Sequence, residues 1–114
     1  MNVKLSVITS GLLLAVSNLS FAADVAPVMD PKSCEQPKYP KAALMNEETG
    51  TVTMGFLISP DGKVVESKVE KSSGSKSLDK AALSALSLCK FKPGTKDGKA
   101  DQLWAKVDFV WKLE

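Results

Sequence analysis

Residues 51–69 read TVTMGFLI, then SPDG, then KVVESKV, and they carry the clearest structural pattern of this chain. Large apolar side chains occupy every second position of residues 51–58, which is the period of a half-buried β-strand. In the SPDG segment, Pro60 presets φ for a turn and Gly62 permits the positive φ of a bulge. The stretch therefore predicts an antiparallel β-hairpin. The alternating apolar residues of its first strand are Val52, Met54, Phe56 and Ile58.

The second strand of the hairpin is expected to place Val65 and Val69 on its apolar face, with Glu66, Lys68 and Glu70 on the opposite face. An isolated hairpin is only marginally stable in water, so its apolar face needs a third strand or a helix. The remainder of the chain is expected to supply both.

Two helices flank the hairpin in the expected order of elements. Pro40 suits the first position of a short helix, and Gly50 suits its C-cap. The second helix is expected to begin at the N-cap Ser77, with Asp79 in its first turn, and to end by residues 91–94, which read FKPG. Its buried face combines small and apolar side chains at helical spacing, namely Leu78, Ala82, Ala85, Leu86 and Cys89.

A long strand is expected over residues 103–113, after a polar loop at residues 95–101. The order helix, strand, strand, helix, strand predicts an α+β fold. We expect a two-layer sandwich with a three-stranded antiparallel sheet and two helices on one face. The core side of the last strand holds Leu103, Ala105, Val107, Phe109, Trp111 and Leu113, and its other side holds Trp104, Lys106, Asp108, Val110 and Lys112.

The N-terminus has the layout of a secretory signal peptide. Lys4 precedes an apolar stretch at residues 5–16, and residues 20–22 (SFA) end in a small side chain. Cleavage is expected after Ala22, or else after Ala23. The alternative is an uncleaved membrane anchor, because residues 5–23 are just long enough to span a bilayer. After cleavage, residues 23–33 are expected to be a mobile N-terminus with no periodic pattern, and residues 34–114 to be the folded domain.

Composition excludes several classes of function. The formal net charge is +2 without a clustered basic segment, so no nucleic-acid partner is expected. The sequence contains no His, the commonest general base near neutral pH and the commonest metal ligand. Ser77 and Lys80 have the Ser-x-x-Lys spacing of some serine hydrolases, but we interpret them as a helix cap and a solvated lysine. We therefore expect no enzyme, metal, cofactor or small-molecule substrate.

The two cysteines, Cys34 and Cys89, predict one disulfide in an exported chain. Closing the loop between them is worth about 4 kcal/mol in the chain-entropy model, which is an upper value. The alternative is a pair of buried free thiols.

An open three-stranded sheet leaves two edges that can accept an extended peptide by strand addition. Trp104 lies on the non-core side of the last strand, where a flat aromatic ring could anchor a partner. In the alternative interpretation, Trp104 packs on a loop while Lys106, Asp108 and Lys112 protect the edge from aggregation. Exposed edges also permit either a monomer or a strand-exchanged dimer.

Three short motifs, in this order, resemble the C-terminal domain of the TonB family, the energy transducers of Gram-negative envelopes. Residues 36–40 (QPKYP) resemble the family's Gln-Pro-x-Tyr-Pro segment, and residues 59–64 (SPDGKV) resemble its Pro-Asp-Gly-x-Val turn. Residues 91–94 (FKPG) resemble its aromatic-x-Pro-Gly segment. The resemblance covers residues 34–114, and the cysteine pair is not part of its motifs.

The resemblance implies a protein-binding function. The family's domain binds the N-terminal box of outer-membrane transporters by adding a strand beside its last strand, which here implicates Trp104, Lys106, Asp108, Val110 and Lys112. It also implicates Gln36, Pro37, Tyr39 and Pro40, although Tyr39 and Pro40 could equally form a staple at the helix entry.

We expect a periplasmic module that recognises an extended segment of an outer-membrane transporter or another envelope protein. Cleavage of the expected signal peptide would leave it without a tether to the inner membrane. The alternative is a membrane-anchored energy transducer subunit in which residues 5–23 are retained.

Overall fold

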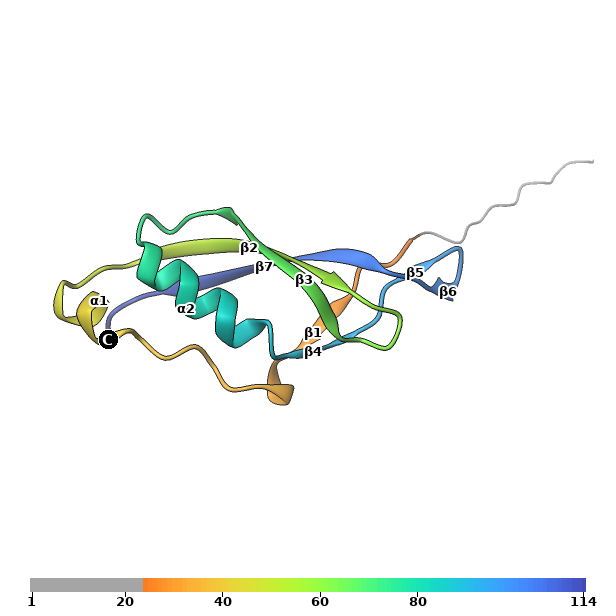
Figure 1. Cartoon of the computed structure of the whole chain (residues 1–114), viewed down its shortest axis with the longest axis horizontal. Helices are drawn as coiled ribbons and strands as arrows, with labels where there is room; N and C mark the ends of the chain where they lie inside the picture. The colour runs from red at the N-terminus through yellow and green to blue at the C-terminus, as the bar shows by residue number, and fades with distance from the viewer. Residues whose placement is uncertain (1–23) are drawn as a thin grey trace, which may run out of the picture.

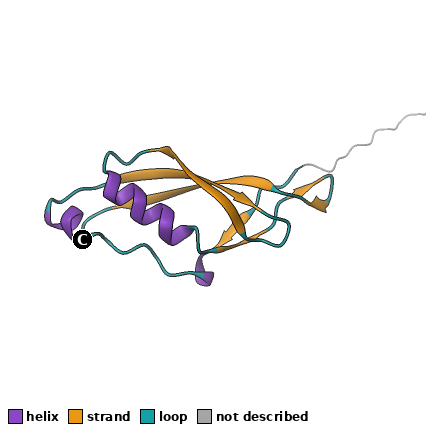
Figure 2. Cartoon of the chain, in the orientation of Figure 1, coloured by secondary structure: helices purple, strands orange, loops and turns teal. Residues whose placement is uncertain are grey.

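A computed structural model describes residues 24–114, and its central feature is a three-stranded antiparallel sheet (Figure 1). The strand order is β3-β2-β7, so that β2 is central and β3 and β7 form the edges. The helix α2 crosses one face of this sheet, and α1 lies at one end of it (Figure 2). These elements span Lys41–Met45 (α1), Gly50–Ile58 (β2), Val64–Lys71 (β3), Lys76–Leu86 (α2) and Leu103–Trp111 (β7). The predicted α+β fold is confirmed.

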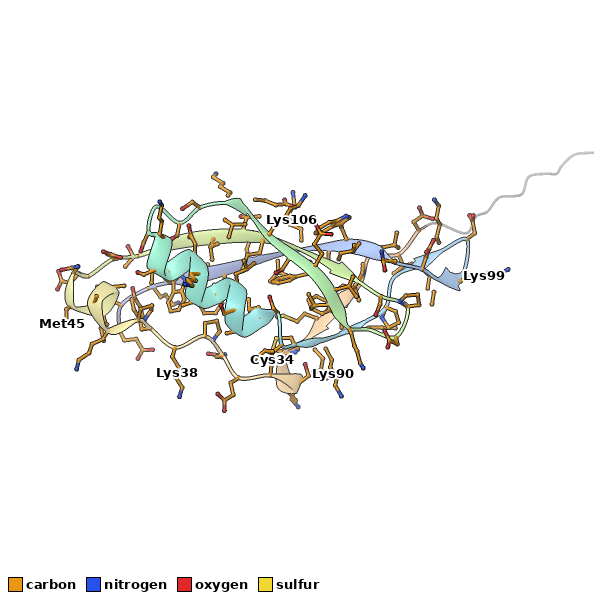
Figure 3. All side chains as sticks on the ribbon, viewed as in Figure 1. Cys34, Lys38, Met45, Lys90, Lys99 and Lys106 are labelled. Carbon is orange, nitrogen blue, oxygen red and sulfur yellow. A yellow bond between two sulfur atoms is a disulfide. The ribbon has the colours of Figure 1, made fainter. Side chains whose placement is uncertain are left out.

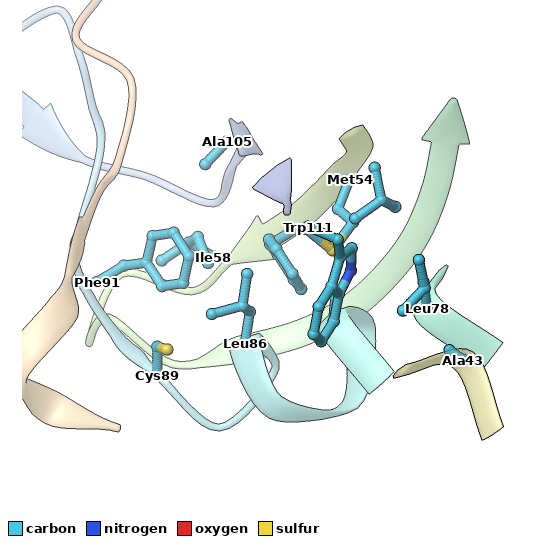
Figure 4. Packing of buried hydrophobic residues seen from close by; sticks show 12 residues of the cluster. Ala43, Met54, Ile58, Leu78, Leu86, Cys89, Phe91, Ala105 and Trp111 are labelled. Atoms are coloured by element: carbon cyan, nitrogen blue, oxygen red, sulfur yellow. The ribbon is translucent and has the colours of Figure 1, made fainter. Parts of the chain in front are cut away.

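The core lies between α2 and the inner face of the sheet (Figure 4). The alternating residues of β2 that the sequence predicts to be buried are all fully buried. Leu78, Ala82, Leu86 and Cys89 form the facing side of α2 and of the turn that follows it, and they are also buried. From β7, Ala105 and Trp111 complete the cluster, with Val107 and Phe109 partly buried against it.

The hairpin turn forms as its sequence predicts. The carbonyl of Ser59 accepts a hydrogen bond from the Gly62 N–H at 2.9 Å, and Gly62 has a φ of 89°. The Ser59 hydroxyl donates to the Asp61 carboxylate, which lowers the pKa of this exposed group. The Gly62 carbonyl in turn accepts the Phe91 N–H at 2.9 Å, so the tip of the hairpin is docked on the chain after α2.

Of the two valines expected on the inner face of β3, Val69 lies opposite the buried Met54, but the expectation for Val65 is wrong. The register shifts between Leu57 and Ile58, so that Leu57 is opposite Glu66 but Ile58 is opposite Val64. The extra residue of this irregularity is Val65, whose side chain is 54% exposed, while Val64 packs against the core. A bulge reverses the side-chain alternation beyond it.

Both helices end earlier than their sequences predict, at Met45 and Leu86, and α2 also begins two residues earlier. The N-cap of α2 is Ser75, whose hydroxyl accepts from the Leu78 N–H at 3.3 Å, so Ser77 lies inside the helix. Helix α1 ends at Met45 rather than near Gly50, which is the first residue of β2. The bend is made by Glu47 at a φ of 54°, in the left-handed region where glycine is usual.

Additional short strands occur where no regular structure was expected. Within the segment before Cys34, β1 (Val28–Asp30) pairs antiparallel with β4 (Lys90–Lys92) and leads into a single turn of 3-10 helix, η2 (Pro31–Ser33). The expected polar loop holds a small hairpin of β5 (Thr95–Lys96) and β6 (Lys99–Ala100). The segment where we expected the signal peptide is outside the described residues, so cleavage stays a prediction. No helix in residues 24–114 has the length and apolar character needed to cross a membrane.

Candidate functional site

The outer edge of β7 is the first part of the candidate site. β2 pairs with β7 along its whole length, from Gly50 opposite Trp111 to Ile58 opposite Leu103. No other strand among residues 24–114 pairs with β7. Peptide groups that point away from β2 are therefore available to a further strand.

The half of β7 nearer its start carries a small polar and aromatic cluster on the outer face of the sheet. Trp104 is 40% exposed, and the Lys68 Nζ lies 4.5 Å from its ring centroid, within cation–π range. Lys106 forms an exposed ion pair with Glu70, with 3.7 Å between Nζ and Oε1. Such a pair adds little stability. Trp104 thus packs beneath a lysine of β3, whereas the alternative interpretation placed it on a loop.

Gly55 of the central strand allows the side chains of β3 to reach those of β7 across the outer face of the sheet. It lies in β2 opposite both Lys68 and Lys106, between β3 and β7. A Cβ added at this position would lie 2.5 Å from the Glu70 Oε2 and 3.3 Å from the Lys68 Cε. The missing side chain leaves room on the outer face of the sheet, and Glu70 and Lys68 of β3 occupy it. Side chains of β3 therefore cover part of the outer face beside Gly55.

A four-residue segment, which we call the strap (residues 35–38), forms the second part of the candidate site. It runs without helix or strand structure between η2 and α1 (Figures 1 and 3). The strap is preceded by Cys34, which is joined to Cys89 by a disulfide with a Cα–Cα separation of 4.7 Å. It is followed by Tyr39 and Pro40, the N-cap of α1.

Tyr39 anchors its end of the strap to the last residues of β7. Its ring contacts the Trp111 ring edge to face, with 4.9 Å between centroids. Its hydroxyl donates a hydrogen bond to the Glu48 carbonyl, just after α1. These contacts agree with the staple interpretation of Tyr39 at the helix entry. They leave its role in binding a partner as a proposal.

The strap and the end of β7 line a shared surface hollow of about 310 Å³, which we call the β7 hollow. It brings together two sets of residues implicated by the resemblance, one from the QPKYP segment and one from the last strand. Its lining residues are Gln36, Pro37, Tyr39, Phe109, Val110, Trp111, Lys112 and Glu114.

The other implicated residues are not part of this hollow. Trp104 and Trp111 are separated along the strand by about 23 Å at the usual rise per residue. Trp104 and Lys106 therefore belong to the opposite half of the edge, and Asp108 lies between the halves. Pro40 caps α1 and does not line the β7 hollow. The candidate site is a long edge with a hollow at one end.

Sequence reasoning assigned Phe109 and Trp111 to the core alone and did not include Glu114. In the structure all three line the β7 hollow, and the Phe109 and Trp111 rings contact each other at 4.9 Å between centroids. Two large aromatics at alternate positions near the end of an edge strand are the signal that could have indicated this role. Among residues 24–114, no group of three or more His, Cys, Asp or Glu side chains is placed to hold a metal ion.

Comparisons with known proteins agree on one family. The family model for the C-terminal region of the Gram-negative bacterial TonB protein matches residues 35–113. The protein tonB2 of Pseudomonas aeruginosa is 35% identical over 77 residues, covering 68% of this chain and 28% of that protein. The TonB protein of Haemophilus ducreyi is 46% identical over 55 residues, covering 48% of this chain and 20% of that protein. The chain thus spans less than a third of these relatives.

Solved structures agree with the sequence comparisons. The solution structure of the Pseudomonas aeruginosa TonB C-terminal domain aligns with a TM-score of 0.61 and 26% identity, covering 77% of this chain and 87% of that one. The corresponding domain of Helicobacter pylori TonB gives a TM-score of 0.52 and 28% identity, covering 68% of this chain and 70% of that one.

Proposed function

This chain belongs to the family of TonB C-terminal domains, and we propose that it is a periplasmic protein-binding module. It takes up an extended segment of an outer-membrane transporter, or of another envelope protein, as an added strand along β7. The family consists of energy transducers for transport. We therefore propose that this chain has a binding role in TonB-type transport and not an enzymatic one.

The observation that carries the proposal is the unpaired edge of β7 together with the β7 hollow at its end. An extended peptide beside β7 gains main-chain hydrogen bonds from the edge, which provide affinity independent of sequence. Side chains of the peptide that reach the hollow meet Pro37, Phe109 and the aliphatic part of Lys112, which provide selectivity. The exposed side chains of Trp104 and Val110 extend this contact along the outer face.

The decisive experiment uses the N-terminal segment of a TonB-dependent transporter as a synthetic peptide. In an added strand, successive peptide N–H groups point alternately toward β7 and away from it. We therefore expect N-methylation of one alternating set of amides to abolish binding, measured by calorimetry, while N-methylation of the other set has little effect. Equal effects of both sets would contradict strand addition, and no binding of the unmodified peptide would contradict the proposed function.

Variants of the protein then locate the contact. Trp104→Ala tests the first half of the edge, and Val110→Lys tests the half beside the β7 hollow. Thr95→Ala lies in the β5–β6 hairpin and serves as a control away from the edge. We expect at least one of the two edge variants to bind the peptide more weakly than the wild type. The control variant should bind it as the wild type does.

The periplasmic location rests on the expected signal peptide. We expect the protein recovered from the cell envelope to have an intact mass that begins at Ala23 or Asp24, with both cysteines protected from alkylation. A mass that retains Met1 in the membrane fraction would instead support the anchored transducer subunit. The Cys34–Cys89 disulfide of the structure fits export to an oxidising compartment.

A further inference from the structure

The firmest attachments of the strap to the domain are at its two ends. At one end, Cys34 is covalently bonded to Cys89, which is 3% exposed and belongs to the core cluster. At the other end, Tyr39 packs on Trp111 and bonds to the Glu48 carbonyl. None of residues 35–38 forms a hydrogen bond with another residue in the described range 24–114. Pro37 has no N–H to donate.

Packing holds the middle of the strap only through Pro37, which is half-buried and lines a small hollow together with Leu86 and Phe109. Gln36 borders the β7 hollow on one side and a second, larger hollow of about 580 Å³ on the other. The second hollow lies between the strap and α2, and it is lined by Ala81 and Ala85 of the helix and by Leu88 just after it. Glu35, Gln36 and Lys38 are exposed, and Lys38 projects away from the domain (Figure 3). The course of the strap therefore depends on where its ends are attached.

Noncovalent contacts also hold this end of the strap, because β1 pairs with β4 as far as Asp30 opposite Lys90. The Ser33 hydroxyl accepts the Lys90 N–H at 2.7 Å, next to the bonded cysteines. A single exposed hydrogen bond of this kind contributes only about 1 kcal/mol and opens readily. Neither the β1–β4 pairing nor this hydrogen bond involves Cys34 itself. The disulfide restrains Cys34 itself and so determines where the strap begins.

We propose that the Cys34–Cys89 disulfide is a positioning pair for partner binding, because it holds Gln36 and Pro37 at the β7 hollow before the partner arrives. This inference rests on the proposed function and concerns the same site. A strap that is ordered in advance loses less conformational entropy when a peptide binds beside it. Without the disulfide, ordering the strap would weaken binding by about tenfold, at the usual free-energy cost of immobilising about one flexible residue.

The test compares the Cys34→Ala/Cys89→Ala variant with the wild type in two measurements. Calorimetry gives the Kd for the transporter peptide, and limited trypsin digestion gives the rate of cleavage after Lys38. Cleavage after Lys99, at the tip of the β5–β6 hairpin, is the internal control for a remote exposed site (Figure 3). We expect binding about tenfold weaker and faster cleavage after Lys38, with cleavage after Lys99 unchanged.

Two further variants separate positioning from general stability. Ile58→Ala removes a fully buried side chain opposite Leu103 and Val64, away from the strap, and should destabilise the fold without changing either measurement below its unfolding transition. Insertion of Gly-Gly after Glu35 keeps the disulfide and the core but lengthens the strap. We expect it to reproduce the weaker binding and the faster cleavage after Lys38.

The outcomes distinguish this inference from the proposed function. Unchanged binding, or unchanged cleavage after Lys38, in the cysteine variant would overturn the positioning role. The same change in Ile58→Ala would also overturn it, because the effect would then follow from stability alone. If the wild type does not bind the peptide, the proposed function fails, and cleavage after Lys38 still decides whether the disulfide holds the strap.

Discussion

Asp79 shows how a single buried carboxylate ties the start of α2 to the chain before it. Its side chain is 8% exposed, and its Oδ1 accepts hydrogen bonds from the Ser73 N–H at 2.8 Å and from the Ser73 hydroxyl at 2.6 Å. The Ser72 hydroxyl donates to Oδ2. Burial raises the pKa of Asp79, but these hydrogen bonds outweigh it, so the pKa lies below its ordinary value of 3.8.

A lowered pKa makes the contribution of Asp79 to stability depend on pH. The unfolded chain takes up the proton at a higher pH than the folded protein, so stability rises with pH in this range. The contribution is complete above the unfolded pKa and is lost as pH falls through the folded pKa. We expect Asp79→Asn to lower the free energy of unfolding by about 1–3 kcal/mol at neutral pH. In urea titrations, its difference from the wild type should shrink below about pH 4.

Asp108→Asn is the matched control, because Asp108 is exposed on the outer side of β7 and its carboxylate forms no ion pair with any residue from 24 to 114. Its free energy of unfolding should stay close to that of the wild type across the same pH range. A difference for Asp79→Asn that does not change with pH would contradict the role assigned to the ionised carboxylate.

Tyr39 combines two contacts that substitutions can separate. Tyr39→Phe removes only the hydrogen bond to the Glu48 carbonyl and should cost about 1 kcal/mol of stability. Tyr39→Ala also removes the packing on Trp111 and should cost more, and it should shift Trp fluorescence. If the strap must be anchored for binding, Tyr39→Phe should bind the transporter peptide nearly as well as wild type, whereas Tyr39→Ala should bind it more weakly. Equal binding by both variants would limit Tyr39 to a structural role.

Among the secondary-structure elements, the tip of the hairpin requires glycine at position 62 for two reasons. Gly62 has a positive φ, and an added Cβ would lie 2.3 Å from the Phe91 carbonyl oxygen. Gly98 has a similar φ of 80°, but nothing lies within 4 Å of a Cβ there. We expect Gly98→Ala to lose about 1 kcal/mol and Gly62→Ala clearly more, because only the latter must also move β4. Thermal unfolding of the two variants checks this, and equal losses would mean that the contact with Phe91 relaxes without cost.

The elements that could be predicted are those with a long repeating pattern. The alternation in β2 and β7 and the apolar face of α2 identified these three elements and most of their buried residues. The end of α1 could not be predicted, because Glu47 adopts a left-handed conformation that its residue type disfavours. The Glu47 N–H bonds to the Leu44 carbonyl at 3.1 Å and the Glu48 N–H to the Ala43 carbonyl at 2.9 Å, and these bonds compensate for that conformation.

Short strands depend on distant partners and leave no local pattern. β1 has only three residues and forms because β4, about sixty positions later, offers an edge beside the docked hairpin tip.

The candidate site could be predicted only in part. The QPKYP motif identified Gln36, Pro37 and Tyr39 through a resemblance. That they face the end of β7 rather than Trp104 depends on the path of the strap, which Cys34 and Tyr39 determine together.

At the scale of the whole molecule, the Cys34–Cys89 disulfide closes a loop that contains α1, the hairpin and α2. The loop spans 55 residues, for which the chain-entropy model gives an upper value of about 4 kcal/mol. The pairing of β1 with β4 keeps the two cysteines near each other even when they are reduced, which lowers the expected contribution. We expect urea unfolding with and without dithiothreitol to differ by about 2–4 kcal/mol, with the reduced protein still folded in dilute buffer. The Cys34→Ala/Cys89→Ala variant should match the reduced wild type and should not respond to the reductant. If the reduced protein is instead unfolded in dilute buffer, the core between α2 and the sheet contributes less to stability than its complete burial indicates.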